Sequence, residues 1–158
     1  LFSGTIDSNI RYGKPEITDA QVKEAAEVAQ ATEFIDTKPE KYESPVSQGG
    51  TNVSGGQKQR LSIARAIAKD PEIFIFDDSF SALDFKTDSQ LRKALKEYTK
   101  DATTVIVAQR ISTILGADQI IVLDDGHMAG IGTHKELMAN CEVYQQIARS
   151  QLSEEELA

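Results

Sequence analysis

The 158-residue sequence is poor in several residue types that point to particular protein classes. It contains one cysteine, Cys141, which excludes an intrachain disulfide and a zinc site built from several cysteines. Basic residues are fewer than acidic ones, 17 against 25, and the net charge of −8 argues against nonspecific attraction to nucleic acid or anionic lipid. We therefore expect no nucleic-acid partner, while a local phosphate site stays compatible with this charge.

Long hydrophobic runs are also missing. A membrane-spanning helix needs roughly 18 consecutive apolar residues, whereas the most apolar stretches here are strand-sized. These stretches are Ile73–Phe76, Val105–Ala108 and Ile120–Leu123. The chain opens with Leu1-Phe2-Ser3-Gly4, without an initiator methionine or the regions of a signal peptide, so we expect it to start inside a longer protein.

What the sequence does contain is an alternation of helix and strand patterns. Apolar stripes, capping residues and turn formers predict helices over roughly residues 19–35, 57–69 and 85–100, from Thr133, and over 143–152. Strands are predicted at Ile73–Phe76, Thr104–Ala108, Gln119–Leu123 and His127–Ile131, and Ser153–Ala158 is expected to fray. The continuously apolar run at Ile73 is typical of a strand covered on both faces, as in a parallel sheet that the third strand continues.

The most informative segment is Val53-Ser54-Gly55-Gly56-Gln57-Lys58-Gln59-Arg60. Ser54 and Gln57 have the spacing of a capping box, so a helix is expected to begin here. The first turn of a helix presents unpaired N–H groups and the positive end of the helix dipole, and glycine lacks a side chain that would hold an anion away. The segment therefore predicts a phosphate-binding helix start, with an ordinary capped helix as the alternative.

Two carboxylates, Asp77 and Asp78, directly follow the apolar strand. The carboxyl end of a buried parallel strand is where open α/β sheets place their ligands. One carboxylate there can hold Mg²⁺, usually through water, and the next can orient or deprotonate an attacking water. The alternative is that both residues only cap the following helix and solubilise the end of the strand.

In their order along the chain, these segments resemble the ATP-binding-cassette (ABC) transporter family. Val53–Arg60 resembles the signature motif of the family, Ile73–Asp77 its Walker B strand and Ser81–Asp84 its D-loop. Gly132-Thr133-His134 is similar to the start of a late helix in this family. Leu1–Ile10 resembles the segment shortly after the Q-loop, in the form found in exporters with a fused membrane domain rather than in importer ATPases.

The resemblance implies an α/β fold with a parallel sheet. We expect the later part of a RecA-like P-loop NTPase core with an inserted helical subdomain that carries the signature motif. On this basis residues 1–70 would form the helical subdomain, with its start truncated. Residues 71–158 would form the later half of the core, with Walker B, the D-loop, the switch region and the C-terminal helices.

The P-loop of the family, G-x-x-x-x-G-K-[ST], is absent from the sequence. Gly13-Lys14 is the nearest pair, but Ser8 stands in place of the first glycine and Pro15 in place of the hydroxyl residue. In the family, the P-loop and the glutamine of the Q-loop precede the segment that Leu1 begins. We therefore expect this segment alone to bind MgATP weakly or not at all and to be inactive as an ATPase.

Residues of the expected hydrolytic site also depart from the family pattern. Asp78 occupies the position of the catalytic glutamate, and its shorter side chain withdraws the carboxylate by roughly 1 Å, a displacement able to cost about 100-fold in rate. Gln109 replaces the switch histidine; it can hydrogen-bond a γ-phosphate but carries no positive charge. Gln48 replaces the glutamate usual before the signature loop of exporters. The resemblance thus implies a weakened site, with a homodimer in which aspartate suffices as the alternative.

Nucleotide-binding domains of this family pair head to tail, each sandwiching ATP and Mg²⁺ between its own Walker motifs and the signature motif of its partner. The resemblance implies that Asp78 and Gln109 are catalytic and that Asp77 holds Mg²⁺ through water. The residues implied at the partner's ATP site are Ser54, Gly55, Gly56 and Gln57, and those of the D-loop are Ser81, Ala82, Leu83 and Asp84. The expected partners are a second nucleotide-binding domain, in a heterodimer, and the transmembrane domain of the same transporter, at the cytoplasmic face of the cell membrane.

The sequence therefore indicates a nucleotide-binding segment of an ABC exporter that couples ATP binding and hydrolysis to transport. A catalytically silent, soluble ABC-type regulatory or interaction module is the alternative. The remaining candidates are plainer. His127 and His134 have no third metal ligand nearby in the sequence and are expected to play surface polar roles, and Cys141 is expected to pack or lie at the surface rather than to act as a nucleophile.

Overall fold

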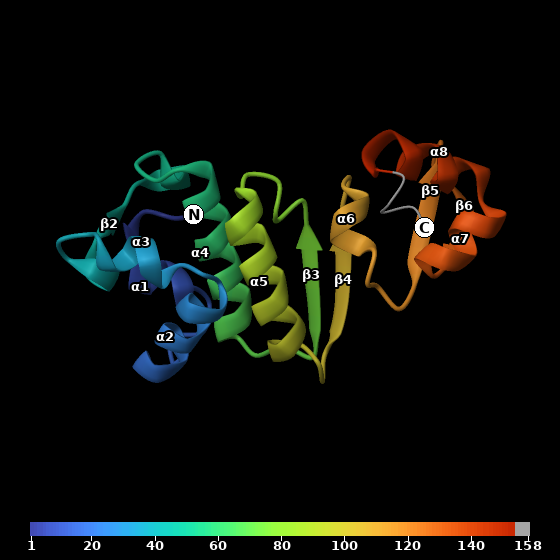
Figure 1. Ribbon diagram of the computed structural model, residues 1–158. Helices are drawn as coiled ribbons and strands as arrows, with labels where there is room; N and C mark the ends of the chain where they lie inside the picture. The colour runs from blue at the N-terminus through green and yellow to red at the C-terminus, as the bar shows by residue number, and fades with distance from the viewer. Residues whose placement is uncertain (154–158) are drawn as a thin grey trace. The chain divides into compact units, whose positions relative to one another are not determined.

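The computed structural model describes residues 1–153, in which helices and strands alternate as in an α/β protein (Figure 1). The chain divides into two compact units, Leu1–Val105 and Ile106–Ala158. The boundary expected at residue 70 separates a subdomain that carries the signature motif from the core. It differs from the division between these two compact units and stays a proposal.

The first unit is built around the helix α4. Its helices are α1 (Ile6–Ile10), α2 (Asp19–Val28), α3 (Thr32–Asp36), α4 (Gly55–Ala68) and α5 (Phe85–Tyr98). Its strands are β1 (Gly4–Thr5), β2 (Pro45–Val46), β3 (Ile73–Asp77) and the start of β4 (Thr103–Val107), which ends in the second unit; its 3₁₀ turns are η1 (Lys41–Glu43) and η2 (Gln48–Gly50). Helices α1 and α2 pack against α4, and α5 lies alongside it, where the Tyr98 hydroxyl donates to the Ile67 carbonyl at 3.4 Å (Figure 1). The apolar stripe predicted for α4 is buried and includes Leu61, Ile63 and Ile67.

The prediction of a single helix over residues 19–35 is wrong, because α2 ends at Val28 and α3 is a separate helix. Between them Gln30 has a left-handed φ of 56°, and its amide donates to the Glu27 carbonyl at 2.9 Å. The next amide donates to the carbonyl five residues back at 2.7 Å, which completes a Schellman ending. Arg60 of α4 reinforces this ending, since its guanidinium donates to the Gln30 carbonyl at 2.7 Å.

Strands β3 and β4 form a two-stranded parallel sheet. Strand β3 follows Asp70-Pro71, after the end of α4, and Phe74 and Phe76 of β3 are buried, with ring centroids 5.9 Å apart. The prediction that the strand is covered on both faces is wrong for the described residues, because Ile73 is 59% exposed and Ile75 is 70% exposed. Successive side chains of a strand point to opposite faces, so one face of β3 is packed and the other is open.

The second unit is a hairpin covered by short helices. It contains α6 (Ile111–Ile114), β5 (Ile120–Asp124), β6 (His127–Gly132), α7 (His134–Asn140) and α8 (Glu142–Gln151). Strands β5 and β6 pair antiparallel around a turn in which Asp125 and Gly126 both have positive φ, 45° and 78°. The prediction that Gln119–Leu123 continues the sheet of β3 and β4 is wrong, since β5 pairs with β6 and the described strands form separate two-stranded sheets. The core of this unit consists of Ile111, Ile120, Val122, Leu137, Cys141, Tyr144 and Ala148.

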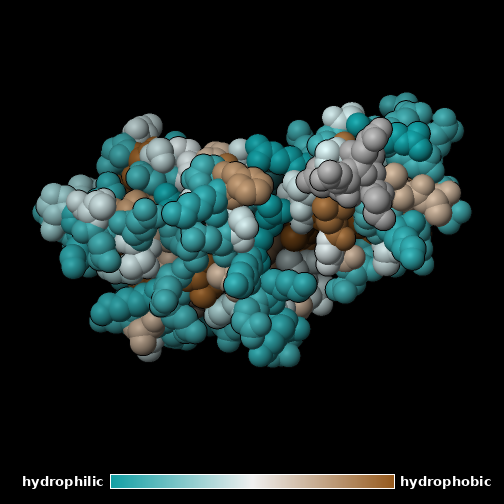
Figure 2. All heavy atoms as spheres, viewed as in Figure 1, coloured by the Kyte–Doolittle hydropathy of each residue, from teal (hydrophilic) through white to brown (hydrophobic). Residues whose placement is uncertain are grey.

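Both predicted C-terminal helices are confirmed. Thr133 and Glu136 form the expected capping box at the start of α7, and α8 covers the predicted tail helix. Of the tail expected to fray, residues 154–158 lie outside the described residues. Within residues 1–153, no helix has the length and apolar character needed to cross a membrane. The face seen in Figure 2 is mainly hydrophilic, as the proportion of charged residues, 27%, leads one to expect.

Candidate functional site

The helix start at Ser54 has the geometry that its spacing predicts. Ser54 Oγ accepts a hydrogen bond from the Gln57 amide at 3.2 Å, and Gln57 Oε1 accepts one from the Ser54 amide at 3.1 Å. Because Ser54 Oγ acts here as an acceptor, its hydroxyl proton can be donated elsewhere. The amides of Gly55 and Gly56 belong to the first turn, which has no intrahelical acceptors. The start of α4 therefore directs hydroxyl and amide donors outward at the positive end of the helix dipole.

Both glycines of this helix start lie against the loop that follows β3. A Cβ added at Gly56 would lie 3.1 Å from the Ala82 carbonyl oxygen, which is tighter than nine in ten real Cβ contacts. A Cβ added at Gly55 would lie 3.4 Å from the Ala82 Cβ, an ordinary contact. The glycines thus allow close packing of α4 on this loop, besides leaving the helix start open to an anion.

The two carboxylates lie at the end of β3. Asp77 is the last residue of the strand, and both Asp77 and Asp78 are exposed. Asp78 has a left-handed φ of 47°, a conformation that aspartate and asparagine tolerate better than most residues. The Ser81 hydroxyl lies 3.1 Å from Asp78 Oδ2 and 3.3 Å from the Asp78 carbonyl oxygen. The carboxylate of Asp78 is thereby turned toward the loop that follows it.

The end of this loop caps α5. Asp84 Oδ1 accepts from the Thr87 amide at 2.9 Å, and Oδ2 accepts from the Thr87 hydroxyl at 2.7 Å. These hydrogen bonds hold the pKa of Asp84 below its usual value. The alternative interpretation of Asp77 and Asp78 as the caps of this helix is therefore wrong.

Gln59, which the sequence analysis did not single out, connects α4 to the loop. Its Nε2 donates to the Asp78 carbonyl at 3.1 Å and to Ser81 Oγ at 3.0 Å, and its Oε1 accepts from the Ala82 amide at 2.9 Å. The signal that could have found it is spacing. Gln59 follows Gly55 and Gly56 by four and three positions and so shares their face of the helix.

Gln109 belongs to the second unit, where it is exposed. Its carbonyl accepts from Gln151 Nε2 at 2.9 Å, and Gln151 Oε1 accepts from the Ile111 amide at 2.9 Å. The side-chain amide of Gln151, at the end of α8, therefore holds the backbone on both sides of Arg110. Sequence reasoning missed Gln151, because its distance of 42 residues from Gln109 leaves no local pattern.

Comparison with known proteins decides the family. The sequence model described as "ABC transporter" matches residues 3–81, which include the Ser54–Gln57 helix start, Asp77, Asp78 and Ser81. The chain belongs to the ABC transporter family.

Relatives in this family extend the match over nearly the whole chain. An uncharacterized ABC transporter ATP-binding protein of Mycobacterium tuberculosis is 47% identical over 154 residues, 96% of this chain and 26% of that protein. A putative multidrug export ATP-binding/permease protein of Staphylococcus aureus is 47% identical over 147 residues, 93% of this chain and 25% of that protein. A bacterial Atm1-family ABC exporter solved with ATP bound superposes with a TM-score of 0.93 at 38% identity, over 98% of this chain and 27% of that one. The chain spans about a quarter of the length of these proteins.

Among the residues predicted for an ABC transporter site, the structure brings most together within the first unit. The predicted signature residues Ser54–Gln57 and the predicted D-loop residues Ser81–Asp84 are in contact through the glycines and Gln59, and Asp77 and Asp78 precede that loop. Gln109, predicted as the switch residue, belongs to the second unit.

The two carboxylates fit a magnesium ion whose remaining ligands would be nucleotide phosphates and water. Asp77 offers a hard oxygen ligand at the exposed end of β3, as Mg²⁺ requires. Within residues 1–153, no group of three or more histidine, cysteine or acidic side chains is arranged to hold a metal by itself. Mg²⁺ at this ABC transporter site would therefore be bound by one or two carboxylates rather than by a protein cage.

His134 and Cys141 have structural partners in the second unit. His134 Nδ1 lies 2.8 Å from the hydroxyl of Tyr144, whose pKa burial raises. Cys141 is buried beside Gly130, where an added Cβ would lie 2.9 Å from its Sγ, so its expected packing role is confirmed.

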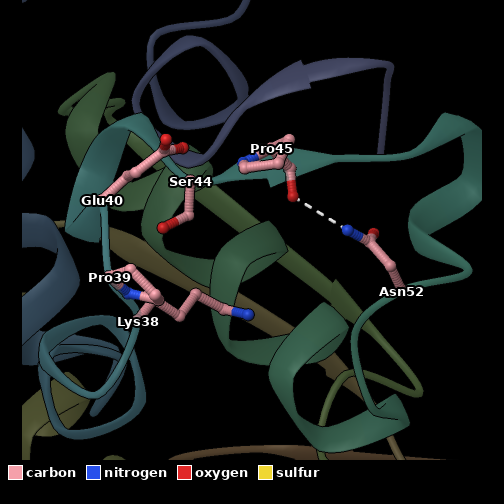
Figure 3. Close-up of a pocket in the computed structure, with 6 residues that line it drawn as sticks. All are labelled: Lys38, Pro39, Glu40, Ser44, Pro45 and Asn52. Atoms are coloured by element: carbon pink, nitrogen blue, oxygen red, sulfur yellow. Dashed lines mark hydrogen bonds between the residues drawn. The ribbon is translucent and has the colours of Figure 1, made fainter.

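A surface pocket of about 260 Å³ lies elsewhere in the first unit (Figure 3). It is lined by Lys38, Pro39, Glu40, Ser44, Pro45 and Asn52. Asn52 fixes one wall, since its Nδ2 donates to the Pro45 carbonyl at 2.8 Å and its Oδ1 accepts from the Ser47 amide at 2.9 Å. None of the predicted ABC transporter site residues lines this pocket.

Proposed function

We propose that this chain is the later part of the nucleotide-binding domain of an ABC exporter, which couples ATP binding and hydrolysis to transport across a membrane. Residues 1–70 form the helical subdomain with the signature motif, and residues 71–158 form the later half of the RecA-like core. The observation that carries the proposal is the capped helix start at Ser54–Gln57, docked through its glycines on the loop that follows Asp77 and Asp78.

The start of α4 serves the ATP site of a partner domain. In a head-to-tail pair, the Ser54 hydroxyl and the amides of Gly55 and Gly56 donate to the γ-phosphate held by the partner's Walker motifs. Gln57 keeps Ser54 in place through the capping box. The D-loop residues Ser81, Ala82, Leu83 and Asp84 lie beside this helix start and complete the same surface.

The carboxylates and Gln109 serve the ATP site on this chain. Asp77 would hold Mg²⁺ through water, and the ion would neutralise charge on the transferring phosphoryl group. Asp78 orients the attacking water and takes its proton, and Gln109 hydrogen-bonds the γ-phosphate. Because aspartate is shorter than glutamate and glutamine carries no charge, this site hydrolyses slowly, while the signature serves a faster site on the partner.

The open face of β3 supports a larger domain around this chain. Ile73 and Ile75 expose apolar side chains at alternate positions of the strand. The chain spans about a quarter of its relatives' length and lacks the P-loop, so the part of the domain that carries the P-loop is the natural cover for this face. For the same reason, this chain alone binds MgATP weakly or not at all and is inactive.

The proposed partners follow from this arrangement. They are a second, non-identical nucleotide-binding domain and the transmembrane domain of the same transporter, and the chain works at the cytoplasmic face of the cell membrane. The S. aureus relative, whose name combines an ATP-binding part with a permease, supports the second partner.

The deciding experiment measures steady-state MgATP hydrolysis by the complete nucleotide-binding domain, without any other subunit, and compares it with an Asp78→Glu, Gln109→His double variant. We expect negligible turnover by the unmodified domain and a gain in the variant. Brisk turnover by the unmodified domain would contradict the heterodimer hypothesis and favour a homodimer in which Asp78 and Gln109 suffice for hydrolysis. No turnover by either would favour the catalytically silent regulatory module.

The signature assignment has its own test in the assembled transporter. Ser54→Arg or Gly55→Asp should abolish hydrolysis at the partner's site, because either change places a bulky charged side chain where the phosphate binds. Nucleotide binding at this chain's own Walker motifs should be largely retained. An equal loss of nucleotide from both sites would contradict the head-to-tail division.

A further inference from the structure

The strongest unassigned feature of the chain is the carboxamide of Gln59. One amide side chain makes three hydrogen bonds to the loop after β3: Nε2 to the Asp78 carbonyl at 3.1 Å, Nε2 to Ser81 Oγ at 3.0 Å, and Oε1 from the Ala82 amide at 2.9 Å. A glutamine amide has two N–H donors and an oxygen with two lone pairs, so most of its capacity is spent on this one loop.

The Ser81 hydroxyl extends this connection to the carboxylate of Asp78. Ser81 Oγ accepts a hydrogen bond from Gln59, and its hydroxyl lies within donating distance of two oxygens of Asp78, Oδ2 at 3.1 Å and the carbonyl oxygen at 3.3 Å. A carboxylate is the stronger acceptor, and the carbonyl already receives the proton of Gln59 Nε2. The arrangement that these distances favour runs from Gln59 through Ser81 to the carboxylate of Asp78.

The backbone of Asp78 needs this support. Its left-handed φ of 47° is a sparsely populated conformation, which persists where surrounding contacts hold it. The hydrogen bond from Gln59 to the Asp78 carbonyl is such a contact. The glycines one turn earlier on the same face of α4 allow the helix to approach closely enough for it, as the tight approach of Gly56 to the Ala82 carbonyl shows.

We infer that Gln59 is a positioning residue, which fixes the carboxylate of Asp78 through Ser81 and so passes displacements of the signature helix α4 to the hydrolytic site on the same chain. The inference rests on the proposed function in taking Asp78 as the residue that orients the attacking water. It connects the two ATP sites of a pair, because the start of α4 faces the partner's nucleotide while Gln59 acts on this chain's own site.

The test replaces Gln59 by methionine in the intact transporter. Gln59→Met keeps the length and helix propensity of the side chain and removes all three hydrogen bonds. Gln90→Met is the matched control, because it makes the same chemical change at an exposed position of α5. Single-turnover hydrolysis at this chain's site, which resolves even a slow rate, is measured over a range of ATP concentrations.

We expect the maximal rate of Gln59→Met to fall by about tenfold to 100-fold, as misplacement of a catalytic group by up to 1 Å would cause, with less than about a twofold change in the half-saturating ATP concentration. Ser81→Ala combined with Gln59→Met should cost less than the product of the two single losses, because both act along one connection. An unchanged maximal rate, a loss confined to ATP affinity, or an equal loss in Gln90→Met would overturn the inference.

Two further measurements separate this inference from the proposed function. Hydrogen–deuterium exchange of the peptide over residues 79–84 should rise in Gln59→Met, since the Ala82 amide loses its acceptor, and stay unchanged in Gln90→Met. Equal exchange in the unmodified protein and both variants would refute the inference that Gln59 holds this loop in place. Asp78→Asn is assayed in parallel. If Asp78→Asn leaves the hydrolysis rate unchanged, both the proposed catalytic role of Asp78 and the inferred role of Gln59 are wrong. If Asp78→Asn lowers the rate and Gln59→Met does not, only the inferred role of Gln59 is wrong.

Discussion

The left-handed backbone of Asp78 leads to a prediction about which side chains this position accepts. With φ at 47°, a residue other than glycine, asparagine or aspartate pays roughly 1 kcal/mol or more for the close approach of its Cβ to the following carbonyl. Asparagine tolerates the left-handed backbone and keeps a side-chain oxygen that can accept a hydrogen bond from Ser81. Glutamine tolerates this backbone less well, and its side-chain oxygen lies one methylene further from the backbone. Asp78→Gln should therefore be less stable than Asp78→Asn by about 1 kcal/mol, although both substitutions remove the same charge.

The assay is thermal unfolding of the intact protein carrying each substitution, followed for the transition of the nucleotide-binding domain. For a domain of about 150–250 residues, a difference of about 1 kcal/mol corresponds to a melting temperature roughly 2–4 °C lower for the glutamine variant. Asp78→Gly serves as the control, because it accepts the left-handed backbone but cannot bond to Ser81. It should resemble the asparagine variant more than the glutamine one. Equal melting temperatures for Asp78→Asn and Asp78→Gln would show that the backbone conformation imposes no selection, and Asp78→Glu would then restore the family's glutamate without a conformational cost.

Three further predictions concern α4 and α5. Leu61→Ala should destabilise the protein by about 2–5 kcal/mol in denaturant titrations, since Leu61 is 0% exposed, whereas Phe85→Ala, at 87% exposed, should stay within about 0.5 kcal/mol; equal effects would contradict the assigned core. The carboxylate of Asp84 has a lowered pKa, so its contribution to stability is present above the pKa of the unfolded state and is lost as pH falls through the pKa of the folded state. Asp84→Asn should therefore flatten the acid side of a profile of unfolding free energy measured between neutral pH and about pH 3. An unchanged profile would refute this. Gly56→Ala should raise hydrogen–deuterium exchange in the D-loop while Gly55→Ala should not, because only the first forces the Ala82 carbonyl to move; identical exchange in both variants would disprove the packing argument.

Local signals were sufficient where the chain itself supplies the partner. The capping box of Ser54 and Gln57 connects residues three apart, and the turn at Asp125-Gly126 needs only residues that accept positive φ. Both features could be predicted from the sequence and both are present. The place of Asp77 and Asp78 after a predicted strand suggested metal and proton chemistry, and family resemblance then made the proposed roles specific.

Features that depend on distant partners could not be predicted. The break between α2 and α3 occurs at Gln30, a residue type without a preference for the left-handed conformation, and its carbonyl is satisfied by Arg60, thirty residues away. The exposure of Ile73 and Ile75 depends on what covers the strand, which the apolar run itself does not encode. Gln59 was overlooked for the same reason, because its partners belong to a loop about twenty residues further along the chain.

The packing of the signature glycines on Ala82 also determines what an evolutionary comparison of this family can show. The atom that a side chain at position 56 would meet is a backbone carbonyl oxygen, which every amino acid possesses, so no substitution at position 82 can make room. The atom next to position 55 is the Ala82 Cβ, and a change of Ala82 to glycine would remove it. Because that contact is an ordinary one, alanine is accommodated at position 55 beside Ala82, whereas position 56 can vary only if the backbone moves. Invariance of glycine at position 56 would accordingly be explained by packing within one chain, and only invariance at position 55 would be evidence of selection by nucleotide.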